Sequence, residues 1–510
     1  MRLDRTANAK RNFVWGIGNR FVSMVLPFIN RTVFIYVLGV EYLGLNSLYA
    51  SILQMLSLAE LGIGNAIVYH MYKPIANDDT ETICALLKLY RLIYRWIGLA
   101  IFAVGLLIMP FLPDMITGDI PEGVSLYLVY IVYLLNTVIS YWCYIYKSSI
   151  ANAMQRVDIV INVNTITQLL LFVGQVSALY VTASYYIYIA FLPVTTLLNN
   201  LLLSRSVNKN FPQYKCRGHV SRTILQDLKK KVSGLVIQKG CATTRNALDS
   251  ICLSYFLGLS VTGIYNNYYY VMVAVTSIFG VVSSAIVAGV GNSMALNDVQ
   301  KNYADMRRLN FIYMLISGMC TALLLNTYQP FIWLWVGETM MLPFTTVALI
   351  VLYFYVLKMG DVRSVYVSGA GLWWESRYRA IVEVACNIVL NVVLGMYYGV
   401  NGIVAATLIS LFLVNFCWGS QIVFRYYFRD IKVNEYYLNH AKYMLSTIVL
   451  SVISYVCCES FLFYGYIKLI LNFALTGSIM ALGYWLLFHH TVIYKDSMSW
   501  FLGVWDGKIG

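Results

Sequence analysis

Residues 205–232 read RSVNKNFPQYKCRGHVSRTILQDLKKKV and separate two long apolar regions of the chain. The bases of this stretch are Arg205, Lys209, Lys215, Arg217, Arg222, Lys229, Lys230 and Lys231, against the one acid Asp227. Apolar residues make up 60% of the 510-residue chain and charged residues 12%, whereas a soluble domain has about 25% charged residues. This composition excludes an ordinary soluble enzyme and predicts helices that cross a membrane, each of about 20 apolar residues.

Outward from this loop, the apolar runs predict an all-α polytopic membrane protein of about fourteen transmembrane helices. They are expected at 13–38, 43–72, 83–110, 123–146, 158–181, 185–204, 233–257, 263–296, 309–328, 343–368, 378–398, 402–424, 441–463 and 467–493. Basic residues lie in every second connection, and the intervening connections carry almost none. The positive-inside rule therefore places both termini in the cytoplasm and accounts for the net charge of +13 without nucleic-acid binding.

The chain also repeats itself. Leu38-Gly39 in the stretch LGVEYLGL corresponds to Leu257-Gly258 in LGLSVTGI, 219 residues later. Because six spans return the chain to the side where it began, the halves would be parallel repeats with pseudo-two-fold symmetry around a central cavity. The predicted domains are an N-terminal six-helix lobe at 1–204, a basic cytoplasmic linker at 205–232, a C-terminal six-helix lobe at 233–424, and two extra transmembrane helices with a cytoplasmic tail at 425–510.

Two stretches carry a family resemblance. Residues 36–77, YVLGVEYLGLNSLYASILQMLSLAELGIGNAIVYHMYKPIAN, and residues 254–275, SYFLGLSVTGIYNNYYYVMVAV, followed by AIVAGVGNSMA at 285–295, resemble the openings of the two halves of Wzx-type flippases. These polysaccharide and O-antigen flippases belong to the multidrug/oligosaccharidyl-lipid/polysaccharide exporter superfamily. The resemblance implies alternating-access transport of an undecaprenyl-pyrophosphate-linked oligosaccharide from the cytoplasmic to the outer leaflet.

The resemblance also implies a setting. The protein would lie in a bacterial plasma (inner) membrane and serve the synthesis of a capsule, an O-antigen or an exopolysaccharide. Its partners would be the lipid-linked oligosaccharide, membrane lipids, and the polymerase and glycosyltransferases of the same pathway. We expect no enzymatic activity, no cofactor and no bound metal, because the five histidines have no metal-ligand spacing and no nucleotide-binding loop is visible.

Charges inside spans are costly and therefore mark candidate functional residues. A diphosphate needs cations, and arginine binds its oxygens in a bidentate manner. The candidate substrate-binding residues are Arg20, Arg31, Arg91, Arg95, Lys239, Arg245, Lys358, Arg363, Asn387 and Asn391. The candidate ion-coupling acids are Glu60, Asp249, Asp361 and Glu383.

Each candidate has a structural alternative. Arg245 and Asp249, one helical turn apart, form either a structural bridge or part of a cavity. Lys358 and Asp361, three residues apart, form either a structural bridge or a coupling site. Lys88, Arg91 and Arg95 share one helix face, which either anchors to anionic headgroups or gathers the pyrophosphate. Arg31 and Lys239 either serve the cavity or extend to the nearest interface. The stripe of Glu383, Asn387 and Asn391 makes either interhelical hydrogen bonds or a sugar-facing wall.

Two other functions fit the composition. An ion-coupled small-molecule antiporter of the same superfamily would not need the span arginines Arg20 and Arg245. A membrane polysaccharide polymerase or glycosyltransferase would need a sizeable outer loop with acids and bases, whereas the longest outer connections, 111–122 and 329–342, contain no Lys or Arg.

Overall fold

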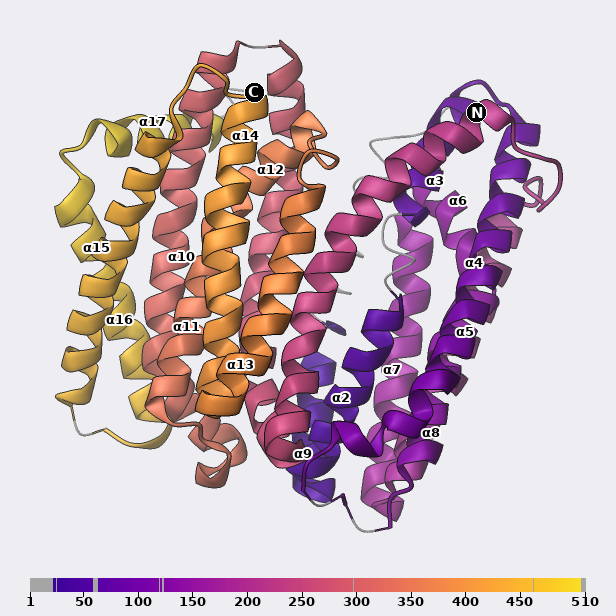
Figure 1. The fold of residues 1–510 in the computed structure, drawn as a ribbon, viewed down its shortest axis with the longest axis horizontal. Helices are drawn as coiled ribbons and strands as arrows, with labels where there is room; N and C mark the ends of the chain where they lie inside the picture. The colour runs from indigo at the N-terminus through magenta and orange to yellow at the C-terminus, as the bar shows by residue number, and fades with distance from the viewer. Residues whose placement is uncertain are drawn as a thin grey trace. The chain divides into compact units, whose positions relative to one another are not determined.

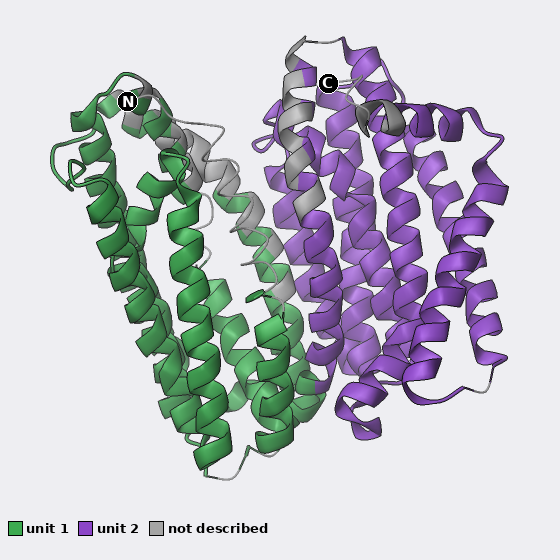
Figure 2. Cartoon of the chain, turned by 180° about the vertical axis from the view of Figure 1, so that it is seen from behind, with its two compact units in different colours: residues 1–263 green, residues 264–510 purple. Residues whose placement is uncertain are grey.

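A computed structural model describes residues 22–23, 25–57, 63–118, 120–121, 123–296, 298–461 and 463–505. Within these ranges every regular element is a helix (Figure 1). The chain forms two compact units, Met1–Gly263 and Ile264–Gly510, drawn green and purple in Figure 2. These two units are defined by which residues lie close together in space. The predicted domains are defined by the sequence repeat, so the units do not test their boundaries.

Unit 1 consists of long helices joined by short connections. Its helices are Val25–Leu38, α2 Val40–Leu56, α3 Ile63–Ala76, α4 Thr80–Ile108, α5 Leu126–Trp142, α6 Ser148–Ala153, α7 Val157–Thr182, α8 Tyr185–Asn210 and the first part of α9 Arg222–Leu296, with 3-10 turns at Met109–Phe111, Pro113–Met115 and Ile145–Lys147. Helix α5 packs against α4 and α8, and α7 packs along α8 (Figure 1).

Unit 2 is built around α10, Val299–Val336. Its other helices are α11 Phe344–Met359, α12 Asp361–Ala370, α13 Arg377–Ser410, a π-helical stretch Leu411–Trp418, α14 Gly419–Tyr426, α15 Val433–Glu459, α16 Gly465–Phe488 and α17 Val492–Trp505, with a 3-10 turn at Glu338–Met340. Asn326 of α10 donates hydrogen bonds to Ser454 of α15 at 2.9 Å and to Thr476 of α16 at 2.8 Å. Buried polar bonds of this kind join α15 and α16 to unit 2.

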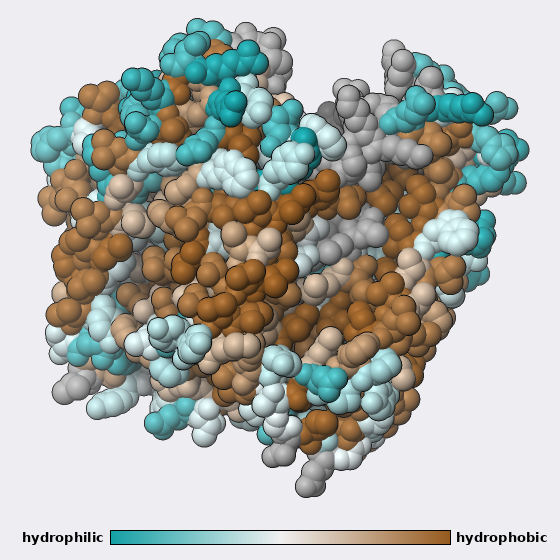
Figure 3. All heavy atoms as spheres, in the orientation of Figure 1, coloured by the Kyte–Doolittle hydropathy of each residue, from teal (hydrophilic) through white to brown (hydrophobic). Residues whose placement is uncertain are grey.

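The surface of the helices is suited to lipid. Nine helices in the described ranges are long and apolar enough to cross a membrane, or ten if the bent pair Leu126–Trp142 and Ile145–Ala153 is one span. Large apolar side chains are exposed along them, for example Leu445, Val452 and Val456 of α15. In Figure 3 apolar residues cover the middle of each unit, and polar residues gather toward its ends. Such an exposed apolar area is not found on soluble proteins, so the chain is a multi-pass membrane protein.

Helix starts at the polar ends are capped by side chains. Asp79 precedes α4, and its carboxylate accepts hydrogen bonds from the Thr82 hydroxyl at 2.6 Å and the Thr82 backbone N–H at 3.0 Å. These bonds favour the charged form and hold the pKa of Asp79 below its usual value. Ser125 caps α5 by accepting from the backbone N–H of Leu128. The N-caps therefore fix where α4 and α5 begin.

Glycines break the longest helical runs. Gly258 interrupts α9 at φ 84° and ψ 177°, and Gly399 interrupts α13 at φ 57° and ψ −133°. Gly39, just before α2, has φ 100° and ψ 175°, so the two turns identified by the repeat share one backbone conformation. Side chains with a Cβ essentially do not adopt it. The run Arg377–Tyr426 would be about 75 Å long if straight, more than twice the hydrocarbon thickness.

The repeated turns also pack against each other in a reciprocal manner. A Cβ on Gly44 would lie 2.0 Å from the carbonyl oxygen of Leu259. At the equivalent position of the repeat, a Cβ on Gly263 would lie 2.4 Å from the carbonyl oxygen of Val40. Both contacts are made by backbone, which cannot move aside as a flexible side chain can. The two turns approach this closely only because glycine stands at both positions.

We expect Gly44→Ala to lower the free energy of unfolding by about 3 kcal/mol, because the added methyl group would overlap the Leu259 carbonyl. Gly240→Ala is the matched control, since among the described residues no neighbour outside its own helical turn lies within 4 Å of the added Cβ, and alanine favours the helix by about 0.5 to 1 kcal/mol. Thermal unfolding of both variants in detergent measures the difference. Equal melting temperatures for the two variants would contradict the close approach.

Candidate functional site

Charged side chains gather inside unit 2 where α11 is followed by α12. The ammonium of Lys358 lies 2.7 Å from the Asp361 carboxylate. The side chain of Lys358 is 3% exposed and that of Asp361 27%, so only the acid reaches the surface of the unit. The hydroxyl of Tyr313, from α10, donates to the same carboxylate. The ring of Phe279 lies 5.2 Å from the ammonium, within cation–π range.

Next along α12, the guanidinium of Arg363 is buried and donates its hydrogen bonds to neutral oxygens. Its Nη2 donates to the Asn415 side-chain oxygen at 2.9 Å and to the Ser364 hydroxyl at 3.2 Å, and its Nη1 donates to the Asn415 main-chain carbonyl. Its Nε has no hydrogen-bond partner within the described ranges. Gly419 makes room for the group, because a Cβ there would overlap Nη1. Arg363 thus holds a positive charge that no carboxylate neutralises directly.

Asn415 connects this arginine to an ion pair on α13. Its side-chain N–H donates to the Glu383 carboxylate at 2.9 Å, and Nη1 of Arg379 lies 2.6 Å from the same carboxylate. Asn415 belongs to the π-helical stretch Leu411–Trp418. Single π-helical turns within helices occur frequently at functional sites, because they change the direction of the side chains that follow.

Farther along α13, the predicted polar stripe lies buried on one face. Asn387 donates to the Thr407 hydroxyl at 3.0 Å, and Asn391 donates to the Asn387 side-chain oxygen at 3.2 Å. Asn387 and Thr407 lie on opposite sides of the break at Gly399, so the helical run folds back on itself there. Asn387 therefore makes an interhelical hydrogen bond, one of the two expectations for this stripe, whereas the bond from Asn391 stays within its own helical segment.

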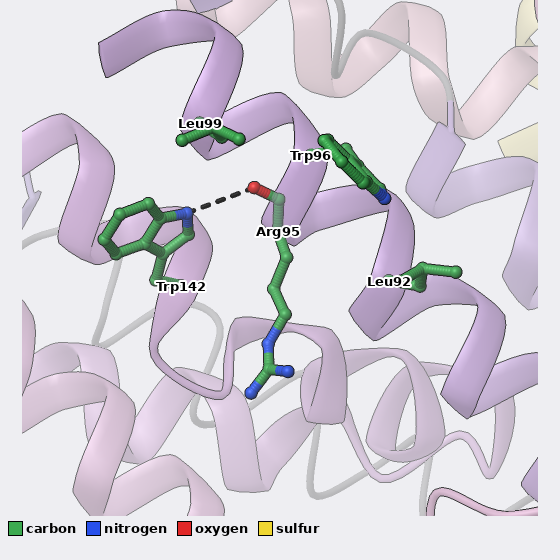
Figure 4. Close-up of a pocket in the computed structure, with 5 residues that line it drawn as sticks. All are labelled: Leu92, Arg95, Trp96, Leu99 and Trp142. Carbon is green, nitrogen blue, oxygen red and sulfur yellow. Dashed lines mark hydrogen bonds between the residues drawn. The ribbon is translucent and has the colours of Figure 1, made fainter. Parts of the chain in front are cut away.

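The described candidates in unit 1 come from the helix Val25–Leu38, from α4 and from α9. Arg31 is half-buried on the helix Val25–Leu38. The adjacent Asn30 donates to Gln175 of α7 at 2.8 Å and to the Tyr188 hydroxyl of α8 at 2.9 Å. On α4, Arg91 is half-buried and Arg95 is exposed. Arg95 lines a groove between α4 and α5 (Figure 4).

Arg245 and Asp249 are both buried, at 5% and 2% exposed, one turn apart on α9. Their burial in a membrane-spanning helix agrees with the interpretation of both residues as internal. Arg20 and Glu60 lie outside the described residues, and so does the side chain of Lys239.

Three members of the unit 2 cluster were not among the candidates. Arg379 could have been found, because it precedes Glu383 by four residues on one helix. Tyr313 and Asn415 gave no sequence signal, since they meet the cluster only through packing of α10 and of the π-helical stretch. The complete cluster has three cations, Lys358, Arg363 and Arg379, against the two acids Asp361 and Glu383. Its excess positive charge favours an anionic ligand.

Comparisons with known proteins agree with the architecture. A family model described as polysaccharide biosynthesis protein matches residues 9–287, which is more than half of the chain. A search of curated proteins gave no match. The structure is similar to the lipid II flippase MurJ in an inward closed conformation, with a TM-score of 0.63 at 12% identity over 94% of this chain and 99% of that one.

Two further solved structures have the same fold. An inward-facing multidrug resistance MATE family transporter of the MOP superfamily gives a TM-score of 0.60 at 14% identity, over 78% of this chain and 94% of that one. A MOP superfamily transporter from Pyrococcus furiosus gives 0.57 at 14% identity, over 82% and 96%. At these identities the similarity concerns the fold, which is that of transporters and not of enzymes. The chain belongs to the polysaccharide biosynthesis protein family and has the membrane-transporter fold of the MATE and MurJ proteins.

Proposed function

We propose that this protein moves a lipid-linked oligosaccharide, joined to undecaprenyl through a pyrophosphate, from the cytoplasmic to the outer leaflet by alternating access. The family supports a role in polysaccharide biosynthesis, and the fold resembles that of a lipid II flippase. The observation that carries the proposal is Arg363, a buried guanidinium inside a membrane protein whose hydrogen bonds go to neutral oxygens of Asn415 and Ser364.

A diphosphate is a stronger partner for this guanidinium than the groups that now hold it. The guanidinium carries the charge of its present hydrogen bonds alone, whereas a phosphate would add a negative charge and accept two parallel N–H bonds from it. An arriving phosphate would therefore displace the Asn415 side chain from Arg363. Movement of Asn415 would in turn change its contact with Glu383. Substrate binding would thus be linked to the ion pair of α13 through a single asparagine.

The proposed topology has fourteen spans in two six-helix lobes around a central cavity, plus α15 and α16, with both termini in the cytoplasm of a bacterial cell. Support comes from the breaks at Gly258 and Gly399, each of which lies inside one helical run where the sequence predicts the end of one span and the start of the next. Further support comes from the shared conformation of Gly39 and Gly258, as parallel repeats require. The polymerase and glycosyltransferases of the same surface polysaccharide would be its pathway partners.

Energy for the movement is proposed to come from an ion gradient or the membrane potential. Asp361 is the best-placed acid for coupling, because its side chain is partly exposed while it contacts the buried Lys358. Protonation of this carboxylate would release the lysine. Glu383 and Asp249 are the other described acids proposed for coupling.

The test is complementation of a flippase-deficient strain whose lipid-linked repeat unit matches the gene cluster of this protein. We expect wild type to restore surface polysaccharide, and Arg363→Gln and Arg245→Gln to reduce it at least about tenfold, since a charge-assisted contact is worth about 1.5 to 3 kcal/mol. Arg429→Gln is the matched control, because Arg429 is exposed after α14. Membrane levels of each variant are compared by immunoblot.

Full restoration by both arginine variants would remove Arg363 and Arg245 from the substrate path. Lack of restoration by correctly inserted wild type would overturn the flippase proposal. Ion-dependent efflux of cationic dyes from such cells would then identify the small-molecule antiporter, the alternative that the MATE-like fold permits.

A further inference from the structure

A groove on unit 1 lies outside the cluster in unit 2. Leu92, Arg95, Trp96 and Leu99 of α4 and Trp142 of α5 line a space of about 490 Å³ (Figure 4), which falls in the range of small-molecule sites, about 300 to 1,000 Å³. Trp96 is 63% exposed and Trp142 45%. The groove is therefore open at the surface of the unit and apolar apart from Arg95.

Local contacts hold the groove in shape. The indole N–H of Trp142 donates to the main-chain carbonyl of Arg95 at 3.2 Å, drawn as the dashed line in Figure 4. Gly98 makes this possible, because a Cβ there would lie 2.5 Å from the indole nitrogen. The two helices thus meet where Trp142 packs on Gly98, and this contact uses the main chain of Arg95 and not its side chain.

The position of Arg95 along α4 corresponds to the edge of the hydrocarbon layer. Residues 96–112, immediately after it, contain no charge, and span about 25 Å as a helix, close to the thickness of the hydrocarbon core. In Figure 4 the guanidinium extends away from Leu99 and Trp142. By the positive-inside rule this end faces the cytoplasm. The Arg95 guanidinium therefore lies at the level of the lipid headgroups, next to an apolar groove that suits a lipid chain.

We propose that the groove between α4 and α5 binds one anionic glycerophospholipid of the inner leaflet, with its phosphate at Arg95 and an acyl chain along Trp96, Leu99 and Trp142. The positive charge of Arg95 and its position at headgroup level match an anionic phospholipid. Of the basic row Lys88, Arg91 and Arg95, Arg95 is the member that lines the groove. The site is separate from the proposed transport site and serves to hold a membrane lipid.

Native mass spectrometry of the full chain in detergent, titrated with phosphatidylglycerol or phosphatidylcholine, tests the proposal. We expect wild type to retain phosphatidylglycerol preferentially and Arg95→Gln to lower that retention about tenfold, since a hydrogen bond to a charged group is lost. Lys88→Gln is the matched control, because it removes the same charge from the same row outside the groove. Leu99→Trp, which fills the groove without changing charge, is expected to lower retention as well.

Equal losses in Arg95→Gln and Lys88→Gln would indicate diffuse attraction to headgroups and overturn the site, as would unchanged binding in Leu99→Trp. A third titration uses undecaprenyl diphosphate. If Arg95→Gln weakens binding of that lipid and leaves phosphatidylglycerol unaffected, the groove belongs to the transported substrate, and the phospholipid proposal is wrong. Melting temperatures without added lipid, expected to equal that of wild type, exclude a folding defect as the cause.

Discussion

Replacement of Glu383 with glutamine is expected to lower the free energy of unfolding by about 3 to 5 kcal/mol, the loss typical of a broken buried ion pair. The Glu383 side chain is 5% exposed and accepts from Arg379 at 2.6 Å and from Asn415 at 2.9 Å. Glutamine keeps the shape but removes the charge. The guanidinium of Arg379, 12% exposed, would then lack this carboxylate close to the equally cationic Arg363.

The control is Glu459→Gln. Glu459 pairs with Lys468 at 3.2 Å, but its side chain is 49% exposed, so its loss should change stability by less than about 1 kcal/mol. Thermal unfolding of both variants in detergent gives the comparison. Similar melting temperatures for the two variants would mean that water reaches Glu383 and screens its charge.

The second large effect is expected at Asp361. Asp361→Asn leaves the ammonium of Lys358, 3% exposed, without its carboxylate, which should cost about 3 to 5 kcal/mol. Lys358→Met in the same background removes the unpaired charge and keeps the stem, so the double variant should regain most of the lost stability. A double-mutant cycle from melting data measures the coupling, which contacting residues usually show at about 0.5 to 3 kcal/mol.

Transport by the stable double variant separates the two interpretations of this pair. A structural bridge predicts near-normal surface polysaccharide, because packing is kept. A coupling site predicts loss of transport despite normal stability, because the double variant lacks the carboxylate that would exchange a proton. A double variant as unstable as Asp361→Asn alone would show that Lys358 is not the group that needs the carboxylate.

Much of the fold was predictable because a membrane imposes simple rules. Apolar run length predicts spans, and basic loops predict orientation. The sequence predicts that the turns at Gly39 and Gly258 are equivalent, and the two glycines have similar dihedral angles. In the part of the chain that the structure describes, nine helices, or ten with the bent pair, are candidate spans. In some places two spans that the sequence predicts as separate form one helical run with a break inside it, as at Gly399. Hydropathy does not reveal such a break.

The candidate site was less predictable. Lys358, Asp361, Arg363 and Glu383 stood out because charge in a span is rare, and their spacing suggested the Lys358–Asp361 pair that forms. Spacing did not show that the hydrogen-bond partner of Arg363 is Asn415, which lies 52 positions later and is not an acid. Nor did it reveal the π-helical turn that carries Asn415, because that geometry depends on backbone packing and not on local propensity.

The sequence by itself determined that this is a helical membrane protein, since hydrophobic length and charge alternation act locally along the chain, and its glycine spacing predicted an internal repeat. Tertiary structure alone decided which charges are neutralised. Whether a buried cation meets a carboxylate, as Arg379 does, or neutral oxygens, as Arg363 does, depends on which helices pack together. At low dielectric that difference amounts to several kcal/mol, because burial removes the water that would otherwise stabilise an unpaired charge.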